Sequence, residues 1–270
     1  IRPIIDMALA EDLGRAGDIT AQACIDPDAR LSVVWAARQD GRIAGLSCAR
    51  LSLGALDPTA TFEVVTPDGA DAAPGAILAR AEGNARAILA AERTGLNLLG
   101  KLSGIATLTR AANLGLPAAQ LKLVGLYEAG ESGVTRNLPE ARLWARRAAE
   151  TGDATGMHAF GMYLYQGVGG VRNTTEGLNW LLKAADTGLV DSQFNLAQLY
   201  ESGLGVSQNP AEAYKWYVIA GRSGDATARS RANALRAQLT AEAQQTADRS
   251  ALAFRPQTQT QTASLTASAP

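Results

Sequence analysis

Histidine, cysteine and unbalanced charge are scarce in this 270-residue sequence, and each shortage excludes a class of function. His158 is the only histidine, and Cys24 and Cys48 are the only cysteines. These residues are too few for a zinc cluster or a disulfide framework, so we expect no metal site, no cofactor, and two reduced thiols in the core. The 25 basic residues nearly balance the 26 acidic ones, so the sequence lacks the excess of positive charge that is typical of nucleic-acid-binding proteins.

Long apolar runs are also missing. No segment approaches the roughly 18 consecutive apolar residues of a membrane span, and no basic-then-apolar leader opens the chain. We therefore predict a cytoplasmic protein with no membrane segment in this chain. Because residue 1 is isoleucine and not a start methionine, the sequence leaves open whether a leader or anchor lies upstream.

The second half of the chain contains an internal repeat. Four residue types recur three times with one period of 36 residues: Trp144, Trp180 and Trp216; Gly152, Gly188 and Gly224; Asn137, Asn173 and Asn209; Gly133, Gly169 and Gly205. A fixed period of this length is typical of stacked structural repeats. The sequence therefore predicts three tandem units of one architecture.

Each unit has the pattern of two helices joined by a glycine-rich turn. In the third unit, Gly203 and Gly205 permit the positive φ angles of a tight reversal. Asn209 and Pro210 then form a helix start, because asparagine caps free amides and proline is tolerated in the first turn. Gly224 fits a left-handed cap at the end of the second helix.

These units resemble Sel1-like repeats, which are related to tetratricopeptide repeats. In the first unit the resemblance rests on Tyr127, Gly130, Gly133, Ala141, Trp144, Ala148, Ala149 and Gly152. It implies an α-solenoid that assembles complexes and has no catalysis of its own, with the tryptophans mostly in the core. Partner proteins would bind polar residues exposed on the first helices, for which we name Lys122, His158, Gln193 and Gln198.

Two segments follow the repeats, which we place at residues 118–226. Residues 227–254 have helix-forming composition and are predicted to cap the stack, while 255–270 are predicted to be a disordered tail. The end of the third turn, Ser207 to Pro210, together with such a tail, resembles the repeat region of alphaproteobacterial polar-localisation proteins.

Residues 1–112 mix helix and strand without a repeat. A helix is expected over 6–13, strands over 31–38, 62–65 and 77–81, and a long helix over 84–102. The sequence therefore predicts a multidomain chain, in which an N-terminal α+β domain precedes an all-α solenoid of helical hairpins and a disordered tail.

This first domain resembles the N-terminal domain of quinolinate phosphoribosyltransferase, also called carboxylating nicotinate-nucleotide pyrophosphorylase. The resemblance rests on the segments 8–14, 17–20, 92–97 and 102–107. It implies conversion of quinolinate and phosphoribosyl pyrophosphate to nicotinate mononucleotide in NAD biosynthesis, and a dimer in which Arg93 lends a guanidinium to the partner's site. The family's catalytic barrel is absent from this chain. Asp18 and Thr20 fit a helix cap more simply than a catalytic role.

Two functions stay open on this evidence. The first is a bacterial protein-interaction scaffold that carries a non-catalytic N-terminal domain. The second is a subunit or fragment of the pyrophosphorylase, an enzyme in which Arg93 completes a barrel on another chain. The abrupt junction near Arg110 to Leu116 also admits an assembly artefact. One arginine cannot replace a whole cationic pocket, so the sequence favours the scaffold and names no catalytic residue.

Overall fold

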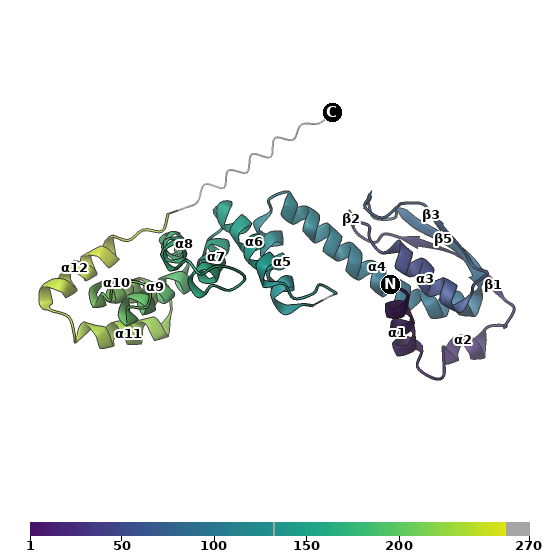
Figure 1. Cartoon of the computed structure of the whole chain (residues 1–270), viewed down its shortest axis with the longest axis horizontal. Coiled ribbons are helices and arrows are strands. Elements are labelled where there is room, and N and C mark those ends of the chain that lie inside the picture. The colour runs from purple at the N-terminus through teal and green to yellow at the C-terminus, as the bar shows by residue number, and fades with distance from the viewer. Residues whose placement is uncertain (132, 258–270) are drawn as a thin grey trace, which may run out of the picture. The chain divides into compact units, whose positions relative to one another are not determined.

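The computed structural model describes residues 1–131 and 133–257, and the chain divides into two compact units. The first unit is Ile1–Ala111 and the second is Ala112–Pro270, so the boundary falls inside the long helix α4 (Ala85–Asn113). In the described residues, Figure 1 shows strands in the first unit and helices in the second. The expected fold class of an α+β domain followed by helical repeats is confirmed. Most of the predicted tail, from residue 258, lies outside the described residues.

The first unit is built on a three-stranded antiparallel sheet of order β1-β5-β3, with a separate antiparallel pair β2-β4. Its elements are α1 (Arg2–Leu13), α2 (Ile19–Cys24), β1 (Arg30–Ala36), β2 (Gly41–Arg42), α3 (Leu46–Leu56), β3 (Thr61–Val64), β4 (Asp71–Ala72) and β5 (Ile77–Asn84), followed by α4. Asp18 caps α2, since its side chain accepts a hydrogen bond from the backbone of Ala21 at 2.9 Å. This agrees with its expected structural role.

Alternation along β1 directs Trp35 into the core of the first unit. Trp35 is 6 % exposed, whereas the neighbouring Val34 is 55 % exposed. The indole packs edge-on against Phe62 of β3, with ring centroids 5.6 Å apart. Helix α4 crosses this indole so closely that a Cβ at Gly95 would lie 2.5 Å from it. Glycine at position 95 is therefore a packing requirement.

The two thiols differ from the expectation that both lie in the core. Cys48 is half-buried on α3, but Cys24 is exposed. Helix α2 is only six residues long and buries Ala21 alone, so its last residue faces solvent. The expectation is wrong for Cys24.

The second unit consists of antiparallel helical hairpins. Its helices are α5 (Pro117–Ala129), α6 (Leu138–Glu150), α7 (Ala154–Gln166), α8 (Thr174–Asp186), α9 (Val190–Ser202), α10 (Pro210–Arg222), α11 (Ala226–Arg236) and α12 (Ala241–Ala253). The pairs α5–α6, α7–α8 and α9–α10 are the three predicted repeats. None of the described helices combines the length and apolar character needed to cross a bilayer.

One capping interaction recurs at the start of the second helix in every repeat. Asn137, Asn173 and Asn209 each accept a hydrogen bond from the backbone three residues later, at 3.1–3.2 Å. The turns before them contain Gly133, Gly169 and Gly205 with φ of 87°, 69° and 76°. The sequence predicted both features.

The tryptophans lie in the core, as expected for Trp144 and Trp216, which are 6 % and 3 % exposed. Trp180 is only half-buried, and its ring packs against Phe160 and beneath the ammonium of Lys183. The second repeat is therefore slightly more open at this position than its neighbours.

The helices of the second repeat approach each other closely at two glycines, Gly161 and Gly177. A Cβ on Gly177 of α8 would lie 2.8 Å from the carbonyl oxygen of Gly161 in α7 and 2.8 Å from the backbone nitrogen of Tyr165. The other repeats have the fully buried Ala141 and Ala213 at this position. The change to glycine therefore accompanies direct backbone packing of α7 on α8.

A second recurring interaction ties α5, α9 and α11 to the helix before each of them, whereas α7 has Met157 at the corresponding position. Nε2 of Gln120 donates to the carbonyl of Ala112 at 3.0 Å, and Nε2 of Gln193 donates to that of Ala185 at 3.1 Å. Arg229 of α11 repeats the contact with Gly221 at 3.2 Å. Each acceptor lies eight residues earlier, so the last turn of α4 takes the place that a repeat helix takes elsewhere.

The segment predicted as one capping helix, residues 227–254, contains two helices. Helix α11 ends at Arg236, and Thr240 caps the start of α12 because its side chain accepts a hydrogen bond from the backbone of Ala243. Ala247 and Ala251 of α12 are buried in the same core cluster as Trp216 of the third repeat. The two helices together cover this end of the repeats.

Candidate functional site

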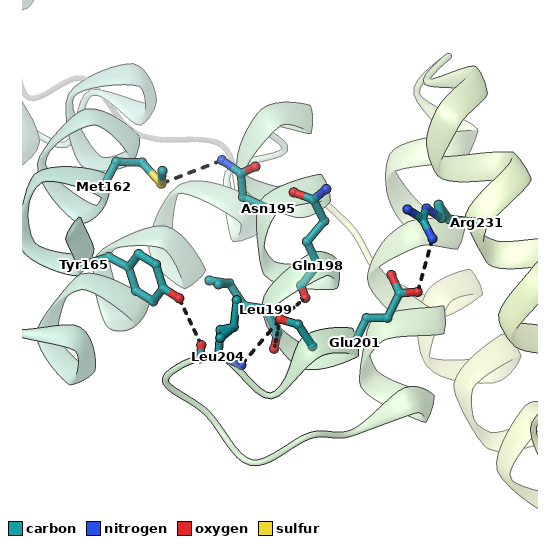
Figure 2. Close-up of a pocket in the computed structure, with 9 residues that line it drawn as sticks. Met162, Tyr165, Asn195, Gln198, Leu199, Glu201, Leu204 and Arg231 are labelled. Carbon is teal, nitrogen blue, oxygen red and sulfur yellow. Dashed lines mark hydrogen bonds and ion pairs between the residues drawn. The ribbon is translucent and has the colours of Figure 1, made fainter.

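A groove crosses the first helices of successive hairpins in the second unit. Its volume is about 590 Å³. The lining residues come from α7 (Met162, Tyr165), from α9 (Asn195, Gln198, Leu199, Glu201, Ser202), from the loop after α9 (Leu204) and from α11 (Arg231). Figure 2 shows Met162 and Tyr165 on one side, Arg231 on the other, and the α9 side chains between them. The repeat architecture thus brings three successive first helices to one surface.

The apolar part of the groove is formed at the turn of the third repeat. Leu204 is 60 % exposed, which is unusual for a leucine in a folded turn. Its backbone is fixed, because the hydroxyl of Tyr165 donates to the Leu204 carbonyl at 3.2 Å and the Leu204 amide donates to Ser202 at 3.4 Å. A held backbone therefore presents this side chain to solvent (Figure 2).

Glu201 links the groove to the core of the third repeat. Its Oε2 accepts a hydrogen bond from the hydroxyl of Tyr217 at 2.7 Å, and its Oε1 lies 3.6 Å from Nη1 of Arg231. Burial, and then the hydrogen bond to this carboxylate, raise the pKa of Tyr217 well above its usual value. The phenol therefore remains a donor, and the Glu201 carboxylate is held towards it.

The four predicted partner-binding residues have different environments. Gln198 lines the groove, and Lys122 is exposed on α5. His158 is half-buried, with Nδ1 2.7 Å from the hydroxyl of Ser192, and burial lowers its pKa. Gln193 is 1 % exposed, so its expected exposure is wrong: its side chain caps the end of α8 instead.

Sequence reasoning missed most of the groove. Asn195 and Arg231 occupy the same position in α9 and α11 as Lys122 occupies in α5, counted from the start of each helix. Aligning the repeats on Lys122 would have identified both residues. Leu204 carried no such indication, because its exposure depends on the turn.

Arg93, the residue at the inherited enzyme position, lies exposed on α4. Its side chain is 74 % exposed, and its Nε lies 3.3 Å from Oδ1 of Asp12. The other carboxylate oxygen of Asp12 accepts a hydrogen bond from Thr94, which is 2 % exposed. Asp12 is thereby fixed, and the outer nitrogens of the Arg93 guanidinium face solvent. This geometry suits an external carboxylate.

Comparison with known proteins agrees with both halves of this description. Residues 18–103 match the quinolinate phosphoribosyl transferase N-terminal domain, and residues 117–153, 154–189 and 190–225 each match the Sel1 repeat. The chain joins a quinolinate phosphoribosyl transferase N-terminal domain to three Sel1 repeats.

Two relatives each match a large part of the chain. Localization factor PodJL of Caulobacter vibrioides is 62 % identical over 171 residues, which are 63 % of this chain and 18 % of PodJL. The chloroplastic carboxylating nicotinate-nucleotide pyrophosphorylase of Arabidopsis thaliana is 37 % identical over 123 residues, which are 45 % of this chain and 35 % of the enzyme. The chain therefore spans about a fifth and a third of these two relatives.

A solved Sel1 repeat protein from Oxalobacter formigenes also matches. It is 31 % identical, and the match covers 49 % of this chain and 98 % of that chain with a TM-score of 0.45.

Proposed function

We propose that this chain is a protein-interaction scaffold: its Sel1 repeats bind partner proteins, and its N-terminal domain has no catalytic activity of its own. The observation that carries the proposal is the groove across α7, α9 and α11, which combines exposed apolar, amide and guanidinium groups. Such a mixture of apolar, amide and guanidinium groups is typical of protein-binding surfaces.

The chemistry of the alternative function supports this choice. Transfer of a phosphoribosyl group to quinolinate needs cations around two carboxylates and a pyrophosphate. In the first unit, Arg93 is the guanidinium at the inherited position, and it is paired with Asp12. The strands of the described residues all end by Asn84, so those residues contain no barrel. A single exposed arginine cannot neutralise this charge.

The proposal extends to location and assembly. Similarity to Localization factor PodJL supports a role in positioning partner proteins in a bacterial cytoplasm. The exposed apolar side chains on and beside α1 support a dimer through the N-terminal domain, since Ile1, Ile4 and Met7 are 68 %, 59 % and 69 % exposed.

Co-purification from a Caulobacter lysate tests the scaffold function. The full chain is compared with a chain carrying Asn195→Ala and Gln198→Ala. These substitutions alter the groove, and neither of the two replaced residues is buried. We expect quantitative mass spectrometry to find proteins that the first chain retains and the second loses. An identical set of retained proteins would contradict the proposal.

The enzyme alternative has one observation in its favour, the solvent-facing guanidinium of Arg93. Its test is carbon dioxide release from quinolinate with magnesium and phosphoribosyl pyrophosphate, measured for the full chain and for Arg93→Ala. We expect background rates from both. Turnover that disappears in Arg93→Ala would establish the enzyme.

A further inference from the structure

The groove contains a guanidinium with unused hydrogen-bonding capacity. The Arg231 side chain is 55 % exposed, and its ion pair among the described residues is the 3.6 Å contact with Glu201. A guanidinium has five N–H donors in a planar fork. Most of these donors therefore remain available to a ligand in the groove.

Glu201 competes only weakly with such a ligand. Its side chain is 28 % exposed, and it accepts a much shorter hydrogen bond from Tyr217, at 2.7 Å. The carboxylate is thus held mainly by the Tyr217 hydroxyl, while Arg231 approaches it from the neighbouring helix α11 (Figure 2). An incoming carboxylate would form a closer pair with Arg231 than Glu201 does.

Two amide side chains line the same groove between Met162 and Arg231 (Figure 2). Asn195 makes a long contact of 3.8 Å with the sulfur of Met162, and Gln198 is exposed. A side-chain amide carries both donors and an acceptor, so it can satisfy the N–H and C=O groups of an extended peptide backbone. The centre of the groove therefore suits main chain.

The opposite side of the groove suits an apolar side chain. Leu204 is 60 % exposed, and Met162 and Tyr165 border it. Methionine adapts to side chains of different shape, which is typical of surfaces that accept varied partners. From one side to the other, the order of the groove is apolar, amide and cationic.

We propose that this groove binds an extended segment of a partner protein that places an aspartate or glutamate at Arg231 and an apolar side chain at Leu204. The inference rests on the proposed scaffold function and specifies the chemistry of the partner. We choose an acidic partner segment because its carboxylate would complement the positive charge of the exposed Arg231. Residues 256–270 of this chain contain no acidic side chain, so its own tail does not meet the requirement.

The test begins with selection of a random displayed peptide library on the full chain. We expect the enriched peptides to share an acidic residue a few positions from an apolar one. One such peptide and its twin with asparagine or glutamine in place of the acid are then labelled, and binding is followed by fluorescence anisotropy. The acidic peptide should bind at least tenfold tighter, which corresponds to about 1.4 kcal/mol.

Substitutions in the groove give effects of opposite sign. Arg231→Gln should weaken the acidic peptide about tenfold and leave its neutral twin unchanged. Glu201→Gln keeps an acceptor for Tyr217 but frees Arg231, so it should tighten the acidic peptide. Arg249→Gln, which removes an exposed cation from α12 outside the groove, is the matched control and should change neither affinity.

Three outcomes would overturn the inference: no enriched peptide, enrichment without acidic residues, or equal effects of Arg231→Gln and Arg249→Gln. If co-purification still depends on the groove, the scaffold function stands and only the partner chemistry is wrong. If co-purification is also independent of the groove, both fail together.

Discussion

Gly177→Ala is expected to destabilise the second unit, although alanine is found at this position in the other two repeats. The new Cβ would lie 2.8 Å from the Gly161 carbonyl oxygen and 2.8 Å from the Tyr165 nitrogen. Both are backbone atoms in a helix, so neither can move aside as a flexible side chain would. Helix α8 would have to shift away from α7.

The magnitude follows from two opposing effects. Overpacking of a close contact costs about 1–3 kcal/mol, and alanine gains about 1 kcal/mol over glycine in a helix interior. We therefore expect a net loss of about 1 kcal/mol, and up to about 2 kcal/mol. For a unit of this size, each kcal/mol lowers the unfolding midpoint by about 2–4 °C.

The control is Gly125→Ala on α5, where a new Cβ meets no atom within 4 Å. It should stabilise the unit by about 1 kcal/mol, because only the helix propensity changes. Urea and thermal unfolding followed by far-ultraviolet circular dichroism measure both variants. If Gly177→Ala stabilises the protein as much as Gly125→Ala does, the close approach of α7 and α8 is refuted.

Three further predictions concern buried polar groups. Gln193→Met should leave the free energy of unfolding unchanged or raise it by up to about 2 kcal/mol. It loses one hydrogen bond, worth about 1 kcal/mol, but it also removes an Oε1 atom that lacks a partner among the described residues. Met157 already fills this position in the second repeat, and a loss above about 1 kcal/mol by urea unfolding would mean that Oε1 is satisfied. Burial lowers the pKa of His158, the single histidine, so nuclear magnetic resonance should show it titrating below pH 6.5. The stability that neutral His158 contributes is complete above pH 6.5 and is lost as the pH falls through the lowered pKa of the folded protein. A titration midpoint at or above pH 6.5 would contradict this prediction. A hydrogen bond from the Asn84 backbone, and next in size one from Thr59, lower the pKa of Asp57. The first unit should therefore lose stability as the pH falls below about 4, and Asp57→Asn should make stability depend less on pH in acid unfolding. An unchanged acid-unfolding profile would contradict the role given to Asp57.

Much of the repeat architecture could be predicted from sequence because its determinants are local. The Asn209 cap and the positive φ of Gly205 depend on residues within one turn, and three copies showed that the pattern was not accidental. Trp216 could be assigned to the core for the same reason. A recurring local pattern therefore predicts the hairpins well.

The burial of Gln193 could not be predicted from polarity alone. Its side chain points at the C-terminal end of the preceding helix, where Ala185 presents a carbonyl group. The same geometry buries Gln120 against Ala112, the last turn of α4. A spacing of eight residues between the glutamine and its acceptor marks both sites, and it becomes meaningful only when the hairpin connection is known.

The groove was harder to predict because it belongs to no single repeat. Gln198 was expected at the surface, but Arg231 comes from a segment that was predicted only to close the stack. Leu204 is exposed because the turn holds its backbone between Tyr165 and Ser202. Three elements must be stacked before these residues share one surface.

Hydroxyl-radical footprinting of the chain with a co-purified partner tests the central claim most directly. The account predicts that Met162, Tyr165 and Leu204 become protected from oxidation, while Leu143 on α6 and Leu182 on α8, which are 40 % and 37 % exposed, react as before. Protection of Leu143 and Leu182 with no change at Leu204 would contradict the assignment of the partner surface to the first helices.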